Sequence, residues 1–293
     1  MYRPWVVTLC ALLVLAGCSA VPGGGGDGDT TETLTPVAVP EAADTPERLA
    51  PGLTEAGVTG PLALANAHGA ALEDSHRFHS NWTVRHRDGS LYALANQSTV
   101  VAPNGFTTRV TVAGRPGFLT TGPRLTADLW SNGSVLAERI ERGDGVGYRY
   151  LGAATYNAGT GFYTSLRRPK PWRDHYALFA AVETRVVDER AGGPGPARYT
   201  VVGTRLRDPT TFGAATDVRE PRNVSLRATI DERGVVRSLR LSYAGRLPRG
   251  EPVRVSRHIR YTTVGGVGSV DRPPWFDTAL NGSRDSRGSI PNP

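Results

Sequence analysis

Apolar and polar residues alternate along most of the chain, with the period of two that is typical of β-strands buried on one face. The alternation is cleanest over 224–231 and 253–261. The alternating runs end in turn sequences such as Asp88-Gly89 and Asn132-Gly133. The sequence therefore predicts an antiparallel meander, with strands over 82–86, 91–101, 106–112, 125–129, 135–142, 146–150, 183–188, 198–206, 224–230, 239–243 and 253–261.

Two segments favour helices instead. Thr59-Gly60-Pro61 is typical of a helix start, and small or apolar residues then recur three and four apart, which predicts a helix over 61–74. Residues 172–182 have helical composition. Three further segments, 49–53, 163–173 and 207–222, are predicted to be irregular. The tail after Leu280 is predicted to be disordered, with Trp275 covering one end of the core.

These elements predict one α+β domain over 48–280 that is mostly β. Its core would be one face of a curved antiparallel sheet, with one or two helices packed on it. A body of this length does not require a second domain.

The first residues predict an exported, lipid-anchored protein. Arg3 precedes an apolar run over 6–16, which is too short for a membrane span of about 20 residues. The sequence Leu15-Ala16-Gly17-Cys18 then matches a lipobox, so residues 1–17 form a predicted signal peptide. Cys18 would become the lipidated N-terminus on the extracytoplasmic face of the membrane.

A tether follows the predicted anchor. Residues 18–47 are rich in Gly, Asp, Thr and Pro and contain little that could be buried, which predicts a flexible linker. The chain has two cysteines, Cys10 in the signal peptide and Cys18. The mature body would therefore have neither a disulfide nor a cysteine-based metal site.

The net charge of +7 is due almost entirely to arginine, since Lys170 is the only lysine. This charge favours binding to an anionic lipid or polymer, although genome composition alone could account for the excess of arginine. The densest basic run could contact anionic head groups beside the anchor, through Arg167, Arg168, Lys170, Trp172 and Arg173; a solvated loop is the alternative.

Five Asn-x-Ser/Thr sequons are candidate glycosylation sites, at Asn81, Asn96, Asn132, Asn223 and Asn281. Two of them, Asn132 and Asn281, precede glycine and are also typical of turns.

No catalytic motif occurs in the chain. It has no Gly-x-Ser-x-Gly, no His-Glu-x-x-His and no P-loop, so we expect neither an enzyme nor a cofactor. His76, His79 and His86 lie close in sequence, but on a strand His79 would point away from the other two. A metal site is therefore not predicted. Nucleic acid is not expected as a partner of an exported chain, and the oligomeric state is left open.

The apolar face of the predicted sheet is the candidate ligand site. It would be either a packed core or the wall of a lipid cavity. Its members are Trp82, Val84, Leu226, Leu239, Leu241, Val255, Ile259 and Tyr261.

Four features together resemble the uncharacterised lipoproteins of haloarchaea. They are the lipobox with its linker, the lead-in over 49–58, the Ile230-Asp231-Glu232-Arg233-Gly234 hairpin and the ending from Tyr261 to Trp275. Those proteins are similar in architecture to the LolA/LppX-type lipoprotein fold, so the resemblance implies a half-barrel whose concave apolar face suits a lipid. The basic charge departs from the acidic composition usual in haloarchaea, and an actinobacterial lipoprotein of similar fold is the alternative source.

The sequence thus favours a cell-surface lipoprotein that binds or carries a hydrophobic or amphiphilic ligand such as a lipid. The alternative is a non-enzymatic structural or interaction protein of the cell envelope, with a solid core and a glycosylated surface.

Overall fold

A computed structural model describes residues 46–114, 122–152, 171–190, 195–216 and 218–288. The chain divides into two units, Met1–Asp44 and Thr45–Pro293, and all the described residues belong to the second. The predicted signal peptide, Cys18 and nearly all of the predicted linker lie outside the described residues.

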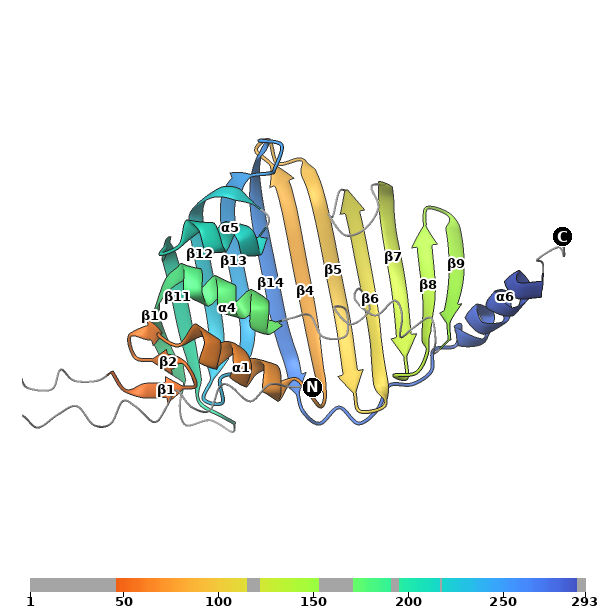
Figure 1. Ribbon diagram of the computed structural model, residues 1–293, viewed down its shortest axis with the longest axis horizontal. Helices are drawn as coiled ribbons and strands as arrows, with labels where there is room; N and C mark the ends of the chain where they lie inside the picture. Colours follow the sequence, from red (N-terminus) through yellow and green to blue (C-terminus); the bar gives the residue numbers. More distant parts are fainter. Residues whose placement is uncertain (1–45, 115–121, 153–170, 191–194, 217, 289–293) are drawn as a thin grey trace, which may run out of the picture. The chain divides into compact units, whose positions relative to one another are not determined.

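One antiparallel sheet of eleven strands dominates this unit, in the order β10-β11-β12-β13-β14-β4-β5-β6-β7-β8-β9 (Figure 1). The strands are β4 (His76–His86), β5 (Leu91–Ala102), β6 (Gly105–Gly114), β7 (Gly122–Ser131), β8 (Leu136–Arg142), β9 (Gly145–Leu151), β10 (Val182–Arg190), β11 (Arg198–Leu206), β12 (Arg219–Asp231), β13 (Val236–Arg246) and β14 (Pro252–Val264).

The sheet consists of two meanders joined in its middle. Strands β4 to β9 pair in sequence, strands β10 to β14 do the same, and β14 pairs with β4. The sheet stays open, with β10 and β9 at its edges. The predicted fold class, a mostly β α+β domain with a large antiparallel sheet and few helices, is confirmed.

The lead-in over 49–58 is more regular than the sequence predicted. It forms a small antiparallel sheet of three strands, β1 (Arg48–Ala50), β2 (Leu53–Thr54) and β3 (Gly57–Val58). Leu53 is fully buried, so this sheet contributes to the core. Gly52 allows its turn: its φ is +75°, and a Cβ at this position would lie 2.1 Å from the carbonyl oxygen of Gly60.

Four described helices accompany the sheet: α1 (Pro61–Ala71), α4 (Pro171–Ala181), α5 (Pro209–Thr216) and α6 (Phe276–Gly288). The first two confirm the predicted helices. The prediction of an irregular segment over 207–222 was wrong, because it contains α5. The Asp208 carboxylate accepts the backbone N–H groups of Thr210 and Thr211, each at 3.0 Å, and so starts this helix ahead of the buried Phe212.

The predicted disordered tail also needs correction, since α6 continues past Leu280 to Gly288. Its first turns are held by packing. Phe276 and Ala279 are buried in one cluster with Trp130 and Ala137, and Trp275 and Leu280 pack against that cluster. Trp275 therefore covers the sheet near β7 and β8.

Helices α1, α4 and α5 lie over the β10–β14 half of the sheet, in front of it in Figure 1. Beneath them is the larger apolar cluster, here called the helix-side core, which includes Phe78, Phe179, Phe212, Leu226, Ile230 and Leu239. The same face of the other half carries the β5–β8 cluster, made of Val101, Phe106, Val110, Val112, Leu125, Ala127, Leu129 and Leu136.

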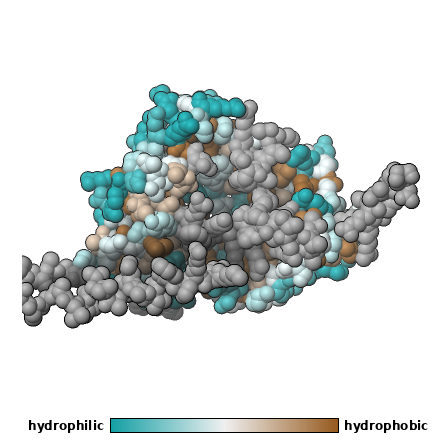
Figure 2. Space-filling model, viewed as in Figure 1, coloured by the Kyte–Doolittle hydropathy of each residue, from teal (hydrophilic) through white to brown (hydrophobic). Residues whose placement is uncertain are grey.

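Helix α6 packs on the face of the sheet opposite to α1, α4 and α5. Leu129 and Leu136 belong to the β5–β8 cluster, whereas their neighbours Trp130 and Ala137 contact α6. Successive side chains of a strand point to opposite faces, so α6 packs on the face away from the other three helices. On the face that carries α1, α4 and α5, hydrophilic residues gather at the upper end of the sheet (Figure 2).

Among the described residues, no helix is long and apolar enough to cross a membrane.

Candidate functional site

The eight predicted ligand-site residues lie together on one face of the sheet, as the alternation indicated. They belong to the helix-side core, where Trp82 is partly buried and the others are at most 6% exposed. Helices α1, α4 and α5 lie over this half (Figure 1). These residues, Trp82, Val84, Leu226, Leu239, Leu241, Val255, Ile259 and Tyr261, therefore serve as packing core, and their role as ligand contacts stays a prediction.

The β5–β8 cluster continues the same face and was not among the ligand-site residues predicted from the sequence. Figure 1 shows none of the described helices in front of β5–β8. The cluster is buried nonetheless: Val110 and Val112 are each 3% exposed. The alternation over 106–112 and 125–129 was a usable signal for the β5–β8 cluster. The sequence did not show which half of the sheet the helices α1, α4 and α5 would leave uncovered.

Polar groups are buried within this apolar half. Glu138 is 3% exposed, and Nε and Nη2 of Arg149 both lie 2.6 Å from its Oε2. The hydroxyls of Thr99 and Thr108 lie 2.9 Å apart, and the Gln97 amide donates to Thr99 at 3.0 Å. The buried Glu138 carboxylate needs the Arg149 guanidinium as a partner, because transferring a charged group from water into the protein interior costs free energy. The face of the sheet that carries the β5–β8 cluster thus combines apolar side chains with hydrogen-bonding groups.

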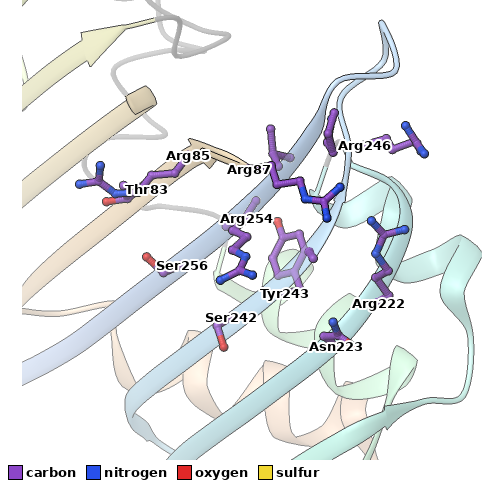
Figure 3. A pocket seen from close by; sticks show the side chains of 14 residues that line it. Thr83, Arg85, Arg87, Arg222, Asn223, Ser242, Tyr243, Arg246, Arg254 and Ser256 are labelled. Atoms are coloured by element: carbon purple, nitrogen blue, oxygen red, sulfur yellow. The ribbon is translucent and has the colours of Figure 1, made fainter. Parts of the chain in front are cut away.

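The opposite face of the sheet carries an arginine groove of about 720 Å³. Its lining includes Arg85, Arg87, Arg222, Arg246 and Arg254 and the hydroxyl side chains of Thr83, Ser242 and Ser256 (Figure 3). The groove crosses β12, β13, β14 and β4. The excess of arginine is evident in the sequence, but its concentration on one face was not predicted.

A bulge in β12 places Arg222 in this groove. The register shifts between Arg222 and Ser225, so three steps along β12 match two steps along β13, from Ala244 to Ser242. Asn223 takes up the extra residue with a φ of +53°, a conformation that asparagine tolerates better than most residues. Such a bulge turns a side chain that would otherwise face the core to the other side of the sheet.

A second hollow of about 520 Å³ lies on the same face. It is lined by polar and basic residues of β14, β4, β5 and β6, among them His79, Asn81, Asn96, Arg109, His258 and Arg260. Because these strands are adjacent, the polar face is continuous from β12 to β6.

The arginines change the acidity of a histidine on this face. Burial, Arg240 and Arg260, in that order, lower the pKa of His258 from its usual value of 6.5. Arg240 is its direct cross-strand partner, and Arg260 is two residues along β14. His258 is therefore more often neutral near pH 6 than an ordinary histidine.

We expect Arg240→Gln to raise the pKa of His258, because one of the two cations that oppose protonation is removed. Burial is the larger cause, so the recovery toward 6.5 should be partial. An NMR titration of the imidazole signals would measure it. The matched control is Arg205→Gln on β11, where Arg205 pairs with Glu183 at 3.5 Å. An unchanged His258 pKa in Arg240→Gln would show that the arginine does not act on it.

Three of the candidate glycosylation sites lie on the polar face. Asn81 and Asn96 are cross-strand neighbours, and the Asn81 amide donates to the Asn96 side-chain oxygen at 2.5 Å. Asn223 lines the arginine groove. Asn132 lies in the β7–β8 turn, where its side chain accepts the N–H groups of Ser134 and Val135. Asn281 is in α6. Glycosylation of these residues stays a prediction.

The remaining sequence candidates do not converge on a site. In the basic run, Arg167, Arg168 and Lys170 lie outside the described residues, while Trp172 and Arg173 fall in the first turn of α4. His76 is buried on the helix side and His79 is exposed on the polar face, so these two cannot share a metal. Over the described ranges, no group of three or more His, Cys, Asp or Glu could hold a metal ion.

Comparison with known proteins gives no family. No family model matches the chain, and the search of curated proteins gave no match. Among solved structures, the lipoprotein LppX of Mycobacterium tuberculosis is 12% identical with a TM-score of 0.35, over 72% of this chain and 98% of that chain. MucB, solved in complex with periplasmic MucA, is 11% identical with a TM-score of 0.26, over 72% of this chain and 59% of that one.

A heme-binding cyclase of neoabyssomicin biosynthesis has a TM-score of 0.15 at 12% identity, over 75% of this chain and 76% of the cyclase. The predicted likeness to LppX-type lipoproteins thus has a counterpart at low structural similarity. Scores of this size carry no argument about function. Membership of a haloarchaeal family stays a prediction.

Proposed function

We propose that this protein is a lipid-anchored lipoprotein of the cell envelope that binds a hydrophobic or amphiphilic ligand, such as a lipid, on the apolar face of its sheet. The anchor would be Cys18, on the extracytoplasmic face of the membrane. The mass of the mature N-terminal peptide tests this part of the proposal: a peptide that begins with an acylated or alkylated Cys18 is expected. An unmodified N-terminus upstream of Cys18 would contradict it.

The observation that carries the ligand proposal is the β5–β8 cluster. It continues the apolar face of the helix-side core but lies outside the area that α1, α4 and α5 cover. An acyl chain placed along Val110, Val112 and Leu125 would be stabilised by about 0.8 kcal/mol for each buried methylene. The polar end of the ligand would meet the Thr99–Thr108 pair and the Glu138–Arg149 ion pair.

Lipid extraction tests the proposal directly. The unit from Thr45 onward would be purified without detergent, extracted with organic solvent and analysed by mass spectrometry. We expect close to one lipid per chain. A folded, stable unit that contains no lipid and takes up none on addition would contradict the proposal.

A single substitution tests whether the ligand binds at the β5–β8 cluster. Ala127, in the centre of the β5–β8 cluster, is 9% exposed. Ala127→Phe should fill space that the ligand would occupy and weaken lipid binding on the order of tenfold, the equivalent of about two methylenes. The melting temperature should change little. The measurements are lipid content after purification and a thermal melt.

Ala228→Phe is the matched control. Ala228 is 1% exposed and lies in the helix-side core. Added bulk there should cost about 1–3 kcal/mol of stability through overpacking and leave the lipid content of the folded fraction unchanged. If Ala127→Phe instead lowers the melting temperature as much as Ala228→Phe and keeps its lipid, the β5–β8 cluster is packed core and not a ligand site.

A further inference from the structure

Four hydroxyl side chains form a row across the polar face of the sheet. Ser225 of β12 pairs with Ser242 of β13, Ser242 pairs with Ser256 of β14, and Ser256 pairs with Thr83 of β4. Adjacent strands are about 4.8 Å apart, so the row extends for about 14 Å at right angles to the strands. We call it the hydroxyl row.

Arginines flank the hydroxyl row on both sides. Two residue pairs further along the strands, Arg254 and Arg85 are cross-strand neighbours. The β12 bulge adds Arg222 in the same line, opposite Ala244 of β13. On the other side, Arg227 pairs with Arg240. The hydroxyl row and these five arginines are here called the basic track.

The charge of the basic track is not balanced locally. Within the described residues, no carboxylate lies within 4 Å of the guanidinium groups of Arg222, Arg227, Arg240 or Arg254. The Arg85 guanidinium donates to the carbonyl oxygen of Gly89. Unpaired arginines held side by side repel one another, and this cost falls when an anion lies between them.

The other half of the same face is balanced. There, Asp128 lies between Arg109 and Arg139, at 3.5 and 3.2 Å, and Arg139 also pairs with Glu141. Opposite charges alternate across β6, β7 and β8. Among the described residues, arginines without a carboxylate partner are therefore more frequent in the β12–β4 part of the polar face than in its β6–β8 part.

We propose that the basic track binds a linear anionic polysaccharide. The polymer would lie across the strands, its sugar hydroxyls bonded to the hydroxyl row and its carboxylate or sulfate groups between the two lines of arginine. Guanidinium groups suit these anions because their planar N–H donors match paired oxygens. The second hollow, with His258 and Arg260, continues the basic track toward β6 and would hold the next units of the chain.

The side chains of the basic track favour this partner over a membrane or a nucleic acid. The hydroxyl row and its flanking arginines include no aromatic or large apolar side chain. Tyr243, which also lines the arginine groove, belongs to the helix-side core and has its ring against Phe212. A membrane-contacting surface would use such side chains at the interface, and a single-stranded nucleic acid would stack its bases on them. A row of hydroxyls suits a ligand that itself carries many hydroxyls.

The test uses the full chain in mild detergent and three polymers. Dextran and dextran sulfate share one backbone and differ in charge, and polygalacturonate is a carboxylate polymer with a different backbone. We expect dextran sulfate and polygalacturonate to bind in isothermal titration at low salt, and dextran not to bind. Arg240→Gln combined with Arg254→Gln should weaken binding about tenfold to hundredfold, as the loss of two hydrogen bonds at a solvent-exposed surface predicts.

The control removes the same charge elsewhere. Arg205 and Arg272 are exposed and each faces a carboxylate, Glu183 and Asp277. Arg205→Gln combined with Arg272→Gln should weaken binding less than about threefold, by screening-dependent long-range attraction alone. Equal losses in the two double variants would mean that net charge drives binding and would overturn the proposal.

Two further arms exclude the other anions. A single-stranded DNA would be titrated in the same buffer. Vesicles of phosphatidylcholine with phosphatidylglycerol would be mixed, in buffer without detergent, with the unit from Thr45 onward, which lacks the anchor. Binding to either that is as tight as to dextran sulfate and equally sensitive to the Arg240/Arg254 variant would overturn the assignment to a polysaccharide. The inference does not rest on the lipid proposal, because the ligand face and the basic track are opposite faces of the sheet, and a chain without lipid could still bind the polymer.

Discussion

Replacing Asp231 by alanine is expected to lower the free energy of unfolding by about 3–5 kcal/mol, the cost of removing one partner of a buried ion pair. The Asp231 side chain is fully buried at the β12–β13 turn. Its carboxylate accepts the backbone N–H groups of Val235 at 3.0 Å and Arg233 at 3.1 Å. Nε of Arg237 donates to it at 2.9 Å. Alanine would leave these donors and a largely buried guanidinium without their acceptor.

The turn that Asp231 organises also docks α1. A Cβ on Gly234 would lie 2.9 Å from the Cβ of Ala67, and the N–H of Val236 donates to Nδ1 of His68 at 3.3 Å. Loss of the carboxylate should therefore loosen α1 as well as the hairpin. Hydrogen exchange would show this as lower protection of the α1 amides in Asp231→Ala.

Urea unfolding followed by circular dichroism measures the main effect. Glu220→Ala is the matched control. Glu220 lies in β12, as Asp231 does, and its carboxylate forms an exposed ion pair with Arg246 of β13. That pair should contribute less than about 1 kcal/mol. Similar losses in the two variants would show that burial of Asp231 adds nothing to the stability of the turn.

The hairpins could be predicted from the sequence because their signals are local. Strict alternation over 224–231 and 253–261 and the Asp88-Gly89 turn each fixed a strand or its end, and the structure confirms them. The pairing of β14 with β4 is different. It joins residues far apart in sequence, and no local pattern specifies which strands become neighbours across a sheet.

The errors came from short segments whose structure depends on tertiary packing. Residues 209–216 contain Thr and Gly, which are weak helix formers, but the Asp208 cap and the burial of Phe212 against Tyr243 stabilise α5. The Asp-Pro sequence before it was a usable N-terminal signal. In the same way, tertiary contacts hold the first turn of α6, because Phe276 packs on Trp130 and Tyr150.

The candidate site was predicted in part. Alternation correctly placed the apolar residues on one face, but it could not show that helices α1, α4 and α5 occupy the half with Leu226 and Leu239. Nor could it show that arginines from β12, β13, β14 and β4 lie side by side on the other face. Both facts depend on strand order, which brings Arg227, Arg240 and Arg254 together only when the register is known.

A buried histidine cluster leads to the last prediction, loss of stability in mild acid. His68 of α1 is fully buried, and its ring centroid lies 4.6 Å from that of His175 of α4 and 4.9 Å from that of Tyr261. Burial, followed by His175, His76 and Arg237, holds the pKa of His68 well below its usual value of 6.5. Its Nδ1 accepts the Val236 N–H, so a proton on that atom would also break this hydrogen bond.

The sign of the pH effect follows from this lowered pKa. Below about pH 6.5 the unfolded chain takes up a proton at His68 that the folded chain does not, so the stabilisation present above pH 6.5 is lost as the pH falls toward the folded-state pKa. From pH 7 to pH 5 this group alone should lower the free energy of unfolding by up to about 2 kcal/mol, at about 1.4 kcal/mol for each pH unit below 6.5. Urea unfolding at a series of pH values measures the slope.

His68→Asn isolates the contribution of this residue, because the Asn side-chain oxygen can still accept the Val236 N–H but does not titrate. The variant should lose about one proton's worth of slope between pH 6.5 and pH 5. His79→Asn, at an exposed position on the polar face, should keep the slope of the original chain. If His68→Asn retains the full slope, the acid sensitivity comes from other groups, and the α1–α4 contact is not where protonation opposes folding.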